Sequence, residues 1–258
     1  MSQETIKGIT HFGWDMFSGE TIMSLIVMGI IVIFSFIVYF KFRKKDPTKP
    51  DKGFVMIIET IVEKLESFTE EMMGKKWSHF SGYAMGLALY IILSFFVSLI
   101  GFPGPLTFLG NTLSIALCTF FLIHITAMKK NKMGYFKRYI DPIPVLLPVN
   151  LLSMWAPLLS LSLRLFGNAL AGYTLMSIVY YFLGLASDFI FGSFIHSGAS
   201  NIFIAPFITP VLHLYFDVFS GMIQTLIFVM LTMIFVSQED PEEEEEASEV
   251  LKIQKGKR

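Results

Sequence analysis

Basic residues are almost absent from the second half of this sequence. Between Tyr139 and Lys252, Arg164 is the only lysine or arginine, and it lies within the strongly apolar stretch 151–182. A charged side chain at bilayer depth costs about 2.5 to 3.5 kcal/mol on insertion scales, so it needs a partner or a water-filled cavity. The neighbouring sequence offers no good acidic partner. The pattern therefore indicates a counter-charge on another polypeptide or an aqueous path.

Cysteine and a cleavable leader are also lacking. Cys118 is the single cysteine, so an internal disulfide is excluded, and its apolar surroundings predict a small core residue. The first 20 residues contain one lysine and no apolar core of the kind that signal peptides have. We expect membrane insertion to begin with the first spanning helix.

What the chain has in excess is apolar residues. Its 258 residues are 53% hydrophobic, and the mean hydropathy is +0.61, which is too high for a soluble domain of this size. The net charge of −1 hides a segregation of cations into short loops and of anions into a C-terminal tail, so it gives no indication of nucleic-acid binding. The composition predicts an all-α integral membrane protein.

Apolar segments divide the chain into about five membrane crossings. About 20 apolar residues in a helix cross a hydrocarbon layer of about 30 Å. We expect one spanning helix at 21–42, two at 81–128, and a long helical hairpin at 143–237. The two hairpin segments would extend roughly 50 to 60 Å, so they must tilt strongly or bend. Prolines that could kink them are Pro148, Pro157, Pro206 and Pro210.

Charges between these segments predict the orientation. The loops 43–80 and 129–142 are rich in lysine, which places them in the cytoplasm by the positive-inside rule. Residues 185–200 contain no lysine or arginine and are expected outside, as is the N-terminal segment 1–20. The tail 238–258 contains a run of glutamates and predicts a disordered cytoplasmic end. Within the first loop, residues 54–73 form an amphipathic pattern that predicts a helix lying on the membrane surface.

Two polar stripes interrupt the hairpin. On a helical wheel, Ser153, Ser160, Arg164 and Asn168 share one face of its first helix. Small residues beside them, Gly167, Ala171 and Gly172, would permit a neighbouring helix to approach closely.

The second stripe lies on the last helix. His213, Asp217, Ser220 and Gln224 recur at spacings of four, three and four residues, which places them on one helical face. An ionisable residue inside a span is by default a functional-site hypothesis. The alternatives are structural: Asp217 could lock the bundle or pair with Arg164, and a neutral His213 could be satisfied in the core.

The motif around Arg164 resembles that of subunit a of the F-type ATP synthase. The string Ser160-Leu-Ser-Leu-Arg-Leu-Phe-Gly-Asn-Ala-Leu-Ala-Gly172 carries the resemblance, a second match begins at Gln224, and weaker similarity at 110–114 extends it over about 82–237. The resemblance implies a non-catalytic stator channel subunit without a cofactor, in a bacterial-type plasma membrane. Its implied partners are the ring of c subunits, the peripheral-stalk b subunits and membrane lipid, with no nucleic acid.

The resemblance also implies roles for individual residues. Arg164 would face the essential carboxylate of the ring, with Asn168 and Gln224 close by. Many members have glutamate nine residues after the arginine, where this chain has Tyr173, and histidine seven residues before the glutamine, where it has Asp217. The carboxylate of the ion-access path would thus have moved from the first hairpin helix to the second.

The implied mechanism uses two offset half-channels. From the predicted orientation, His213 and Asp217 lie toward the outside, whereas Ser153 and Ser160 lie toward the cytoplasm. Arg164 would separate the two paths and couple proton flow to rotation of the ring.

Three other functions remain open from the residues alone. The chain could be a stand-alone ion channel or antiporter subunit that uses Arg164 and Asp217 as its gate. An intramembrane enzyme built on His213 and Asp217 is weaker, because the sequence shows no third metal ligand at suitable spacing and no nucleophile motif. A purely structural anchor would explain the spans and leave the buried arginine unexplained.

Overall fold

The structure of the chain is a computed structural model that describes residues 18–43, 53–131, 147–191 and 204–239. Most of the predicted N-terminal segment, parts of both basic loops and the predicted charged tail beyond residue 239 lie outside these ranges. No strand occurs in the described residues.

Helices account for nearly all of the described chain. In order, they are α2 (Gly19–Arg43), α3 (Phe54–Met73), η1 (Lys75–Phe80), α4 (Ser81–Leu99), η2 (Pro105–Thr107), α5 (Leu109–Asn131), α7 (Leu147–Phe191), α8 (Ala205–His213), η5 (Leu214–Phe219) and α9 (Ser220–Ser237). Five stretches within the described ranges are long and apolar enough to cross a membrane, at 19–43, 75–99, 109–129, 152–190 and 205–237. The predicted all-α membrane fold with five crossings is confirmed.

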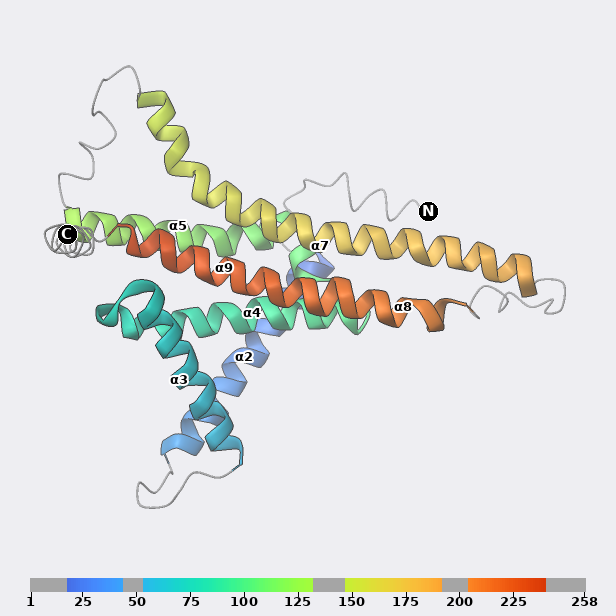
Figure 1. The fold of residues 1–258 in the computed structure, drawn as a ribbon, viewed down its shortest axis with the longest axis horizontal. Coiled ribbons are helices and arrows are strands. Elements are labelled where there is room, and N and C mark those ends of the chain that lie inside the picture. The colour runs from blue at the N-terminus through green and yellow to red at the C-terminus, as the bar shows by residue number, and fades with distance from the viewer. Residues whose placement is uncertain (1–17, 44–52, 132–146, 192–203, 240–258) are drawn as a thin grey trace, which may run out of the picture.

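Four helical rods form the body of the molecule. Figure 1 shows α4, α5, α7 and the α8–α9 rod side by side, while α2 crosses them obliquely and α3 projects away from them. α5 packs against α7, and α9 packs against α4. Large buried side chains at these contacts include Ile91, Leu161, Leu165, Phe228 and Met233. This shared core fixes α7 and α9 relative to each other.

The hairpin helices are longer than a membrane requires. α7 has 45 residues, so at 1.5 Å per residue it is about 68 Å long, more than twice the hydrocarbon thickness. It continues to Phe191, so the first residues of the predicted connection 185–200 are helical. Pro157 lies inside α7, and Pro210 lies inside α8. Figure 1 shows that α7 and α8 extend together beyond α4 and α5.

A π-helical turn interrupts the second rod. Residues Leu214–Phe219 form η5 between α8 and α9, where the sequence stripe assumed a regular α-helix. π-turns have i→i+5 hydrogen bonding, are rare, and occur frequently at functional sites. Asp217 lies within this turn.

One sequence expectation is wrong: Cys118 is exposed on α5 instead of buried. Lipid-facing and core-facing positions of a membrane helix are both apolar, so apolar neighbours in the sequence do not separate them. The amphipathic helix is present as α3, and its apolar residues Met56, Ile57 and Ile61 are exposed. Its position on the membrane surface stays a prediction.

The close packing of α9 on α4 depends on Gly221. A Cβ atom at this buried position would lie 2.7 Å from Cγ of Phe95, so Gly221→Ala forces the ring to move. We expect a loss of about 1 to 3 kcal/mol and a melting temperature several degrees lower in detergent. Gly86→Ala on α4 is the matched control, because nothing lies within 4 Å of its Cβ position. Equal melting temperatures for both variants would contradict this packing.

Candidate functional site

Arg164 has no acidic partner in the described part of its own chain. Its side chain is exposed on α7, and its Nη2 donates a hydrogen bond to the Ser160 hydroxyl one turn earlier, at 3.3 Å. Asp217, the internal partner that the sequence left open, contacts His213 instead. The guanidinium charge is therefore not neutralised within this structure.

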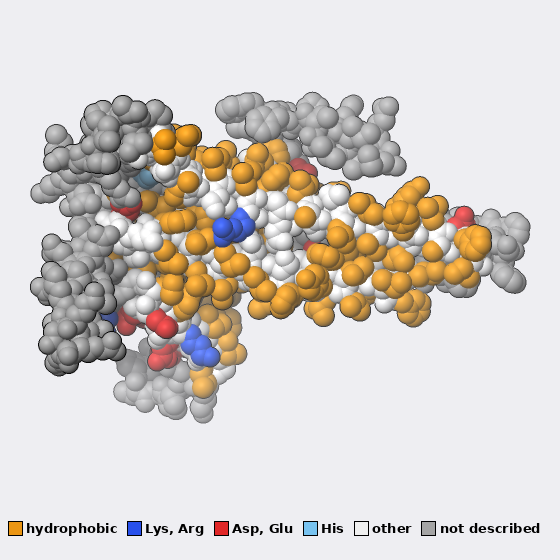
Figure 2. Space-filling model, turned by 45° about the horizontal axis from the view of Figure 1, so that its top comes forward, with side chains coloured by type: hydrophobic (Ala, Val, Ile, Leu, Met, Phe, Trp, Pro, Cys, Tyr) orange, Lys and Arg blue, Asp and Glu red, His pale blue; other side chains and the backbone are white. Residues whose placement is uncertain are grey.

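The surroundings of this charge are apolar. Leu159 and Leu163 beside Arg164 are both about half exposed. Figure 2 shows hydrophobic side chains over most of the visible surface of the helical body, with an isolated basic patch among them. Gly167 and Ala171 are exposed on the same helix, whereas Gly172 faces inward and its Cβ position lies 3.9 Å from Phe216 Cβ. Of the three small residues, Gly167 and Ala171 remain available to a neighbouring chain.

A hydrogen bond joins the two polar stripes near Arg164. The Ser220 hydroxyl donates to Asn168 Oδ1 at 2.8 Å, and so links α9 to α7. Because the two helices run in opposite directions, Arg164 and Gln224 each lie one turn from this pair toward the same end of the molecule. Arg164, Asn168 and Gln224 are thereby brought to one region, as the resemblance implies.

Two amide groups in this region have unused donors. The side-chain nitrogens of Asn168 and Gln224 are buried and have no hydrogen-bond partner within the described ranges. Gln224 as a whole is only 6% exposed. Buried polar groups in proteins are almost always hydrogen-bonded, so these two nitrogens are exceptions within the packing of the hairpin.

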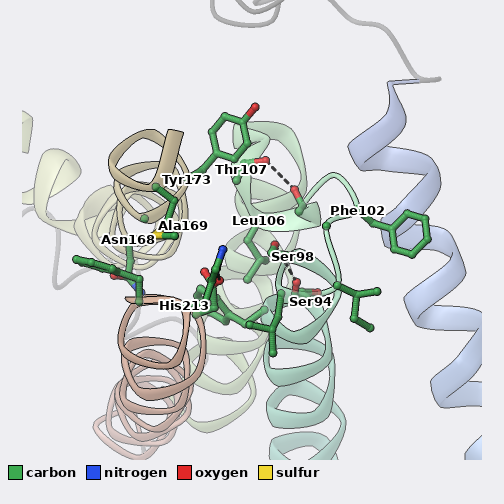
Figure 3. A pocket seen from close by; sticks show the side chains of 18 of the residues that line it. Ser94, Ser98, Phe102, Leu106, Thr107, Asn168, Ala169, Tyr173 and His213 are labelled. Atoms are coloured by element: carbon green, nitrogen blue, oxygen red, sulfur yellow. Dashed lines mark hydrogen bonds and ion pairs between the residues drawn. The ribbon is translucent and has the colours of Figure 1, made fainter. Parts of the chain in front are cut away.

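On the other side of the Asn168–Ser220 pair lies a cavity of about 440 Å³. It is enclosed by the C-terminal part of α4, the connection that contains η2, the middle of α7, and α8 with η5. Its polar lining comprises Ser94, Ser98, Thr107, Asn168, Tyr173, Ser177, Tyr180, His213 and Asp217. Figure 3 shows His213 pointing into the cavity, with Asn168 and Ala169 on one side and Ser94 and Ser98 on the other.

The ionisable groups of the cavity form a connected row. His213 Nδ1 lies 2.5 Å from Asp217 Oδ2, one turn along the same rod. His213 Nε2 lies 2.9 Å from the Tyr180 hydroxyl of α7. Tyr180 was not among the residues that the sequence singled out, because no local pattern relates two residues that are 33 positions apart. Only the hairpin geometry brings them together.

The remaining predicted site residues lie at two places. Tyr173 lines the cavity, and its side chain is largely exposed. Ser153 and Ser160 lie on α7 on the far side of Arg164 from the cavity, and both are exposed. Ser153 donates to the carbonyl oxygen of Val149 at 3.0 Å. The polar residues of α7 thus continue past Arg164 in the direction away from the cavity.

The arrangement suits ion movement better than metal chemistry. Within the ranges that the structure describes, no group of three His, Cys, Asp or Glu side chains could hold a metal ion. The polar cavity reaches Asn168, and the unneutralised cation of Arg164 lies one helical turn beyond it.

Comparison with known proteins shows the family of the chain. The family model described as ATP synthase A chain matches residues 21–237. The chain belongs to the ATP synthase A chain family. As a member of this family, it is a multi-pass protein of the ATP synthase membrane sector, where it works with other subunits in ion transport for ATP synthesis.

Individual relatives match along most of their length. ATP synthase subunit a of Mycoplasma genitalium is 32% identical over 245 residues, which cover 90% of this chain and 84% of the relative. The subunit of Mycoplasma pneumoniae is 31% identical, with 85% and 79% covered. The protein of Propionigenium modestum, named as sodium ion specific, is 26% identical, with 87% and 78% covered.

The hydrogen bond between Ser220 and Asn168 should couple the two hairpin helices energetically. In a double-mutant cycle of Ser220→Ala and Asn168→Ala, we expect a coupling energy of about 0.6 to 1.7 kcal/mol, the range of interhelical hydrogen bonds in membranes. The measurement is unfolding of the detergent-solubilised chain. Ser177→Ala combined with Asn168→Ala is the control, because Ser177 bonds to the carbonyl oxygen of Tyr173 on its own helix. Additive losses in the first cycle would show that the hydrogen bond does not hold the hairpin.

Proposed function

We propose that the chain is the proton-translocating stator subunit of the ATP synthase and that Arg164 couples proton flow to rotation of a ring of c subunits. The observation that carries this proposal is the exposed guanidinium of Arg164, which contacts only Ser160 among the described residues. Its exposed charge calls for an anion from another chain. A carboxylate on a ring subunit would supply both the negative charge and the acceptor oxygens.

The electrostatics of this contact would decide which protonation state of a ring carboxylate is stable beside Arg164. At about 4 Å and an effective dielectric of about 20, opposite unit charges attract by roughly 4 kcal/mol. This attraction favours the deprotonated form of a ring carboxylate opposite Arg164. A protonated carboxylate loses the attraction and can move away into lipid. The cation also repels protons, which suppresses leakage straight past it.

Two offset half-channels would lead to this contact. The cavity with His213, Asp217 and Tyr173 reaches Asn168, and we assign it to the outer path. Ser153 and Ser160 lie beyond Arg164 on α7, and we assign them to the cytoplasmic path. A proton that enters past Asp217 would neutralise a ring carboxylate and, after nearly a full turn of the ring, would leave near Ser160 and Ser153.

The remaining assignments follow from this role. The lysine-rich loops favour a cytoplasmic C-terminus and an N-terminus outside, in a bacterial-type plasma membrane. The partners would be the ring of c subunits at the Arg164 surface and peripheral-stalk b subunits elsewhere. The chain itself would carry out no catalysis, and each charge that crosses gains about 2.3 kcal/mol per 100 mV.

Removal of the Arg164 charge tests the proposal directly. Arg164→Ala should abolish ATP-driven proton pumping in membrane vesicles, because ring carboxylates would no longer be held deprotonated between the two paths. Lys41→Ala is the matched control, since it removes a cation that lies at the end of α2 over the Phe54 ring. Subunit content and ATP hydrolysis are measured in the same vesicles. Pumping at the wild-type rate by Arg164→Ala would refute the assignment.

A variant of Asp217, the carboxylate of the cavity, tests the outer path. Asp217→Asn keeps the size of the side chain and removes its charge, so it should slow passive proton conduction through vesicles stripped of the catalytic sector. Tyr173→Phe, in the same cavity, should slow conduction less, because it leaves the carboxylate and its histidine contact in place. Equal and negligible effects of both variants would remove Asp217 from the path.

A further inference from the structure

With Asp217 ionised and His213 neutral, the row formed by Tyr180, His213 and Asp217 has one hydrogen-bond direction. An ionised carboxylate only accepts hydrogen bonds, so in this state His213 Nδ1, at 2.5 Å, is the donor to Asp217. In a neutral imidazole the other nitrogen is then an acceptor. The Tyr180 hydroxyl, 2.9 Å from Nε2, is therefore the donor to His213. All three groups are satisfied by one continuous chain that points from α7 to Asp217.

This chain runs along the lining of the cavity. Tyr180, His213 and Asp217 all line the cavity. Among the residues that the structure describes, Asp217 is its only acidic lining residue, and no lysine or arginine lines it. The side chains of His213 and Asp217 are 23% and 14% exposed, so the carboxylate is the more enclosed of the two.

We infer that Tyr180 and His213 form a proton relay that loads Asp217 from the cavity, and that Tyr180 is a residue of the ion path in addition to those of the proposed function. This inference rests on the proposed function, in which Asp217 serves the outer half-channel. It adds the route by which the proton reaches the carboxylate and the class of ion that this route admits.

The transfer balances in three coupled steps. A hydronium ion in the cavity gives a proton to the Tyr180 oxygen and becomes water, as the original O–H bond breaks toward His213 Nε2. A new N–H bond forms at Nε2 while the N–H bond at Nδ1 breaks, and the released proton forms an O–H bond on Asp217. The net change is one proton gained and one negative charge lost at Asp217. Exchange of the imidazole protons with water in the cavity restores the starting tautomer.

A relay of hydrogen-bonded side chains carries protons and no metal cation, because a cation such as sodium moves only where oxygen ligands replace its hydration shell. A proton needs only the hydrogen bonds that are present. Pumping should therefore proceed at an unchanged rate in sodium-free buffer.

Removal of one hydroxyl group tests the relay. Tyr180→Phe should lower passive proton conduction about tenfold in vesicles that contain the complete membrane sector. This loss is smaller than the 10²–10⁴-fold rate contribution that is typical of a positioned acid–base group, because water can partly replace the hydroxyl. Tyr181→Phe is the matched control: it removes the same group at the next position, which is exposed and does not line the cavity. It should conduct at the wild-type rate.

The outcomes separate the relay from the proposed function. If Asp217→Asn slows conduction while Tyr180→Phe conducts like Tyr181→Phe, the outer path stands and the relay is overturned. If Asp217→Asn conducts normally, the outer path itself is overturned. Pumping that requires sodium ions would also overturn the relay.

Chemical rescue separates proton transfer from a purely structural role. His213→Ala should conduct slowly, and added imidazole should restore at least part of the conduction, because the vacated space opens on the cavity and free imidazole can carry the same proton. His213→Ala combined with Asp217→Asn controls for protons that imidazole carries through the lipid. Rescue of the double variant to the same extent, or no rescue of the single variant, would show that His213 only positions its neighbours.

Discussion

The arrangement of this molecule depends on a positive charge that its own chain leaves unneutralised. Arg164 is exposed on α7 among leucines, and within the described ranges its guanidinium donates a hydrogen bond to the neutral hydroxyl of Ser160. Holding a guanidinium at bilayer depth costs several kcal/mol on most scales. Such a cost is consistent with a surface that is complete only when a second protein supplies an anion. The exposed small residues Gly167 and Ala171 beside it leave room for that protein to come close.

The hydrogen bond between Ser220 and Asn168 separates two environments along the hairpin. On one side of it lies the cavity, with its tyrosines, histidine and carboxylate. On the other side lie the arginine and the buried amide of Gln224. Because the two helices are antiparallel, this contact and the Tyr180–His213 hydrogen bond together fix the relative level of the polar residues on both. The family match over residues 21–237 includes both helices.

Much of this organisation could be predicted from the sequence. The lengths of the apolar segments predicted the five crossings. The isolated Arg164 with Asn168 and Gln224 indicated the family. Both patterns are visible in the sequence because they are local or repeat at helical spacing. At Cys118 the sequence could not separate an exposed position from a buried one, because lipid and the protein core favour the same apolar residues. Tyr180 could not be found, because it reaches His213 across the hairpin from a position with no distinguishing pattern. The π-turn was missed because the composition of residues 214–219 differs little from that of an ordinary apolar helix.

That π-turn has a geometric consequence for the polar stripe of the second rod. In an uninterrupted α-helix, His213, Asp217, Ser220 and Gln224 would share one face and would all meet the same surroundings. The wider turn of η5 changes the rotation of the rod between His213 and Ser220. His213 and Asp217 consequently border the cavity, while Gln224 is packed in the core. With this irregular turn between them, one half of the stripe borders a polar cavity and the glutamine of the other half is buried.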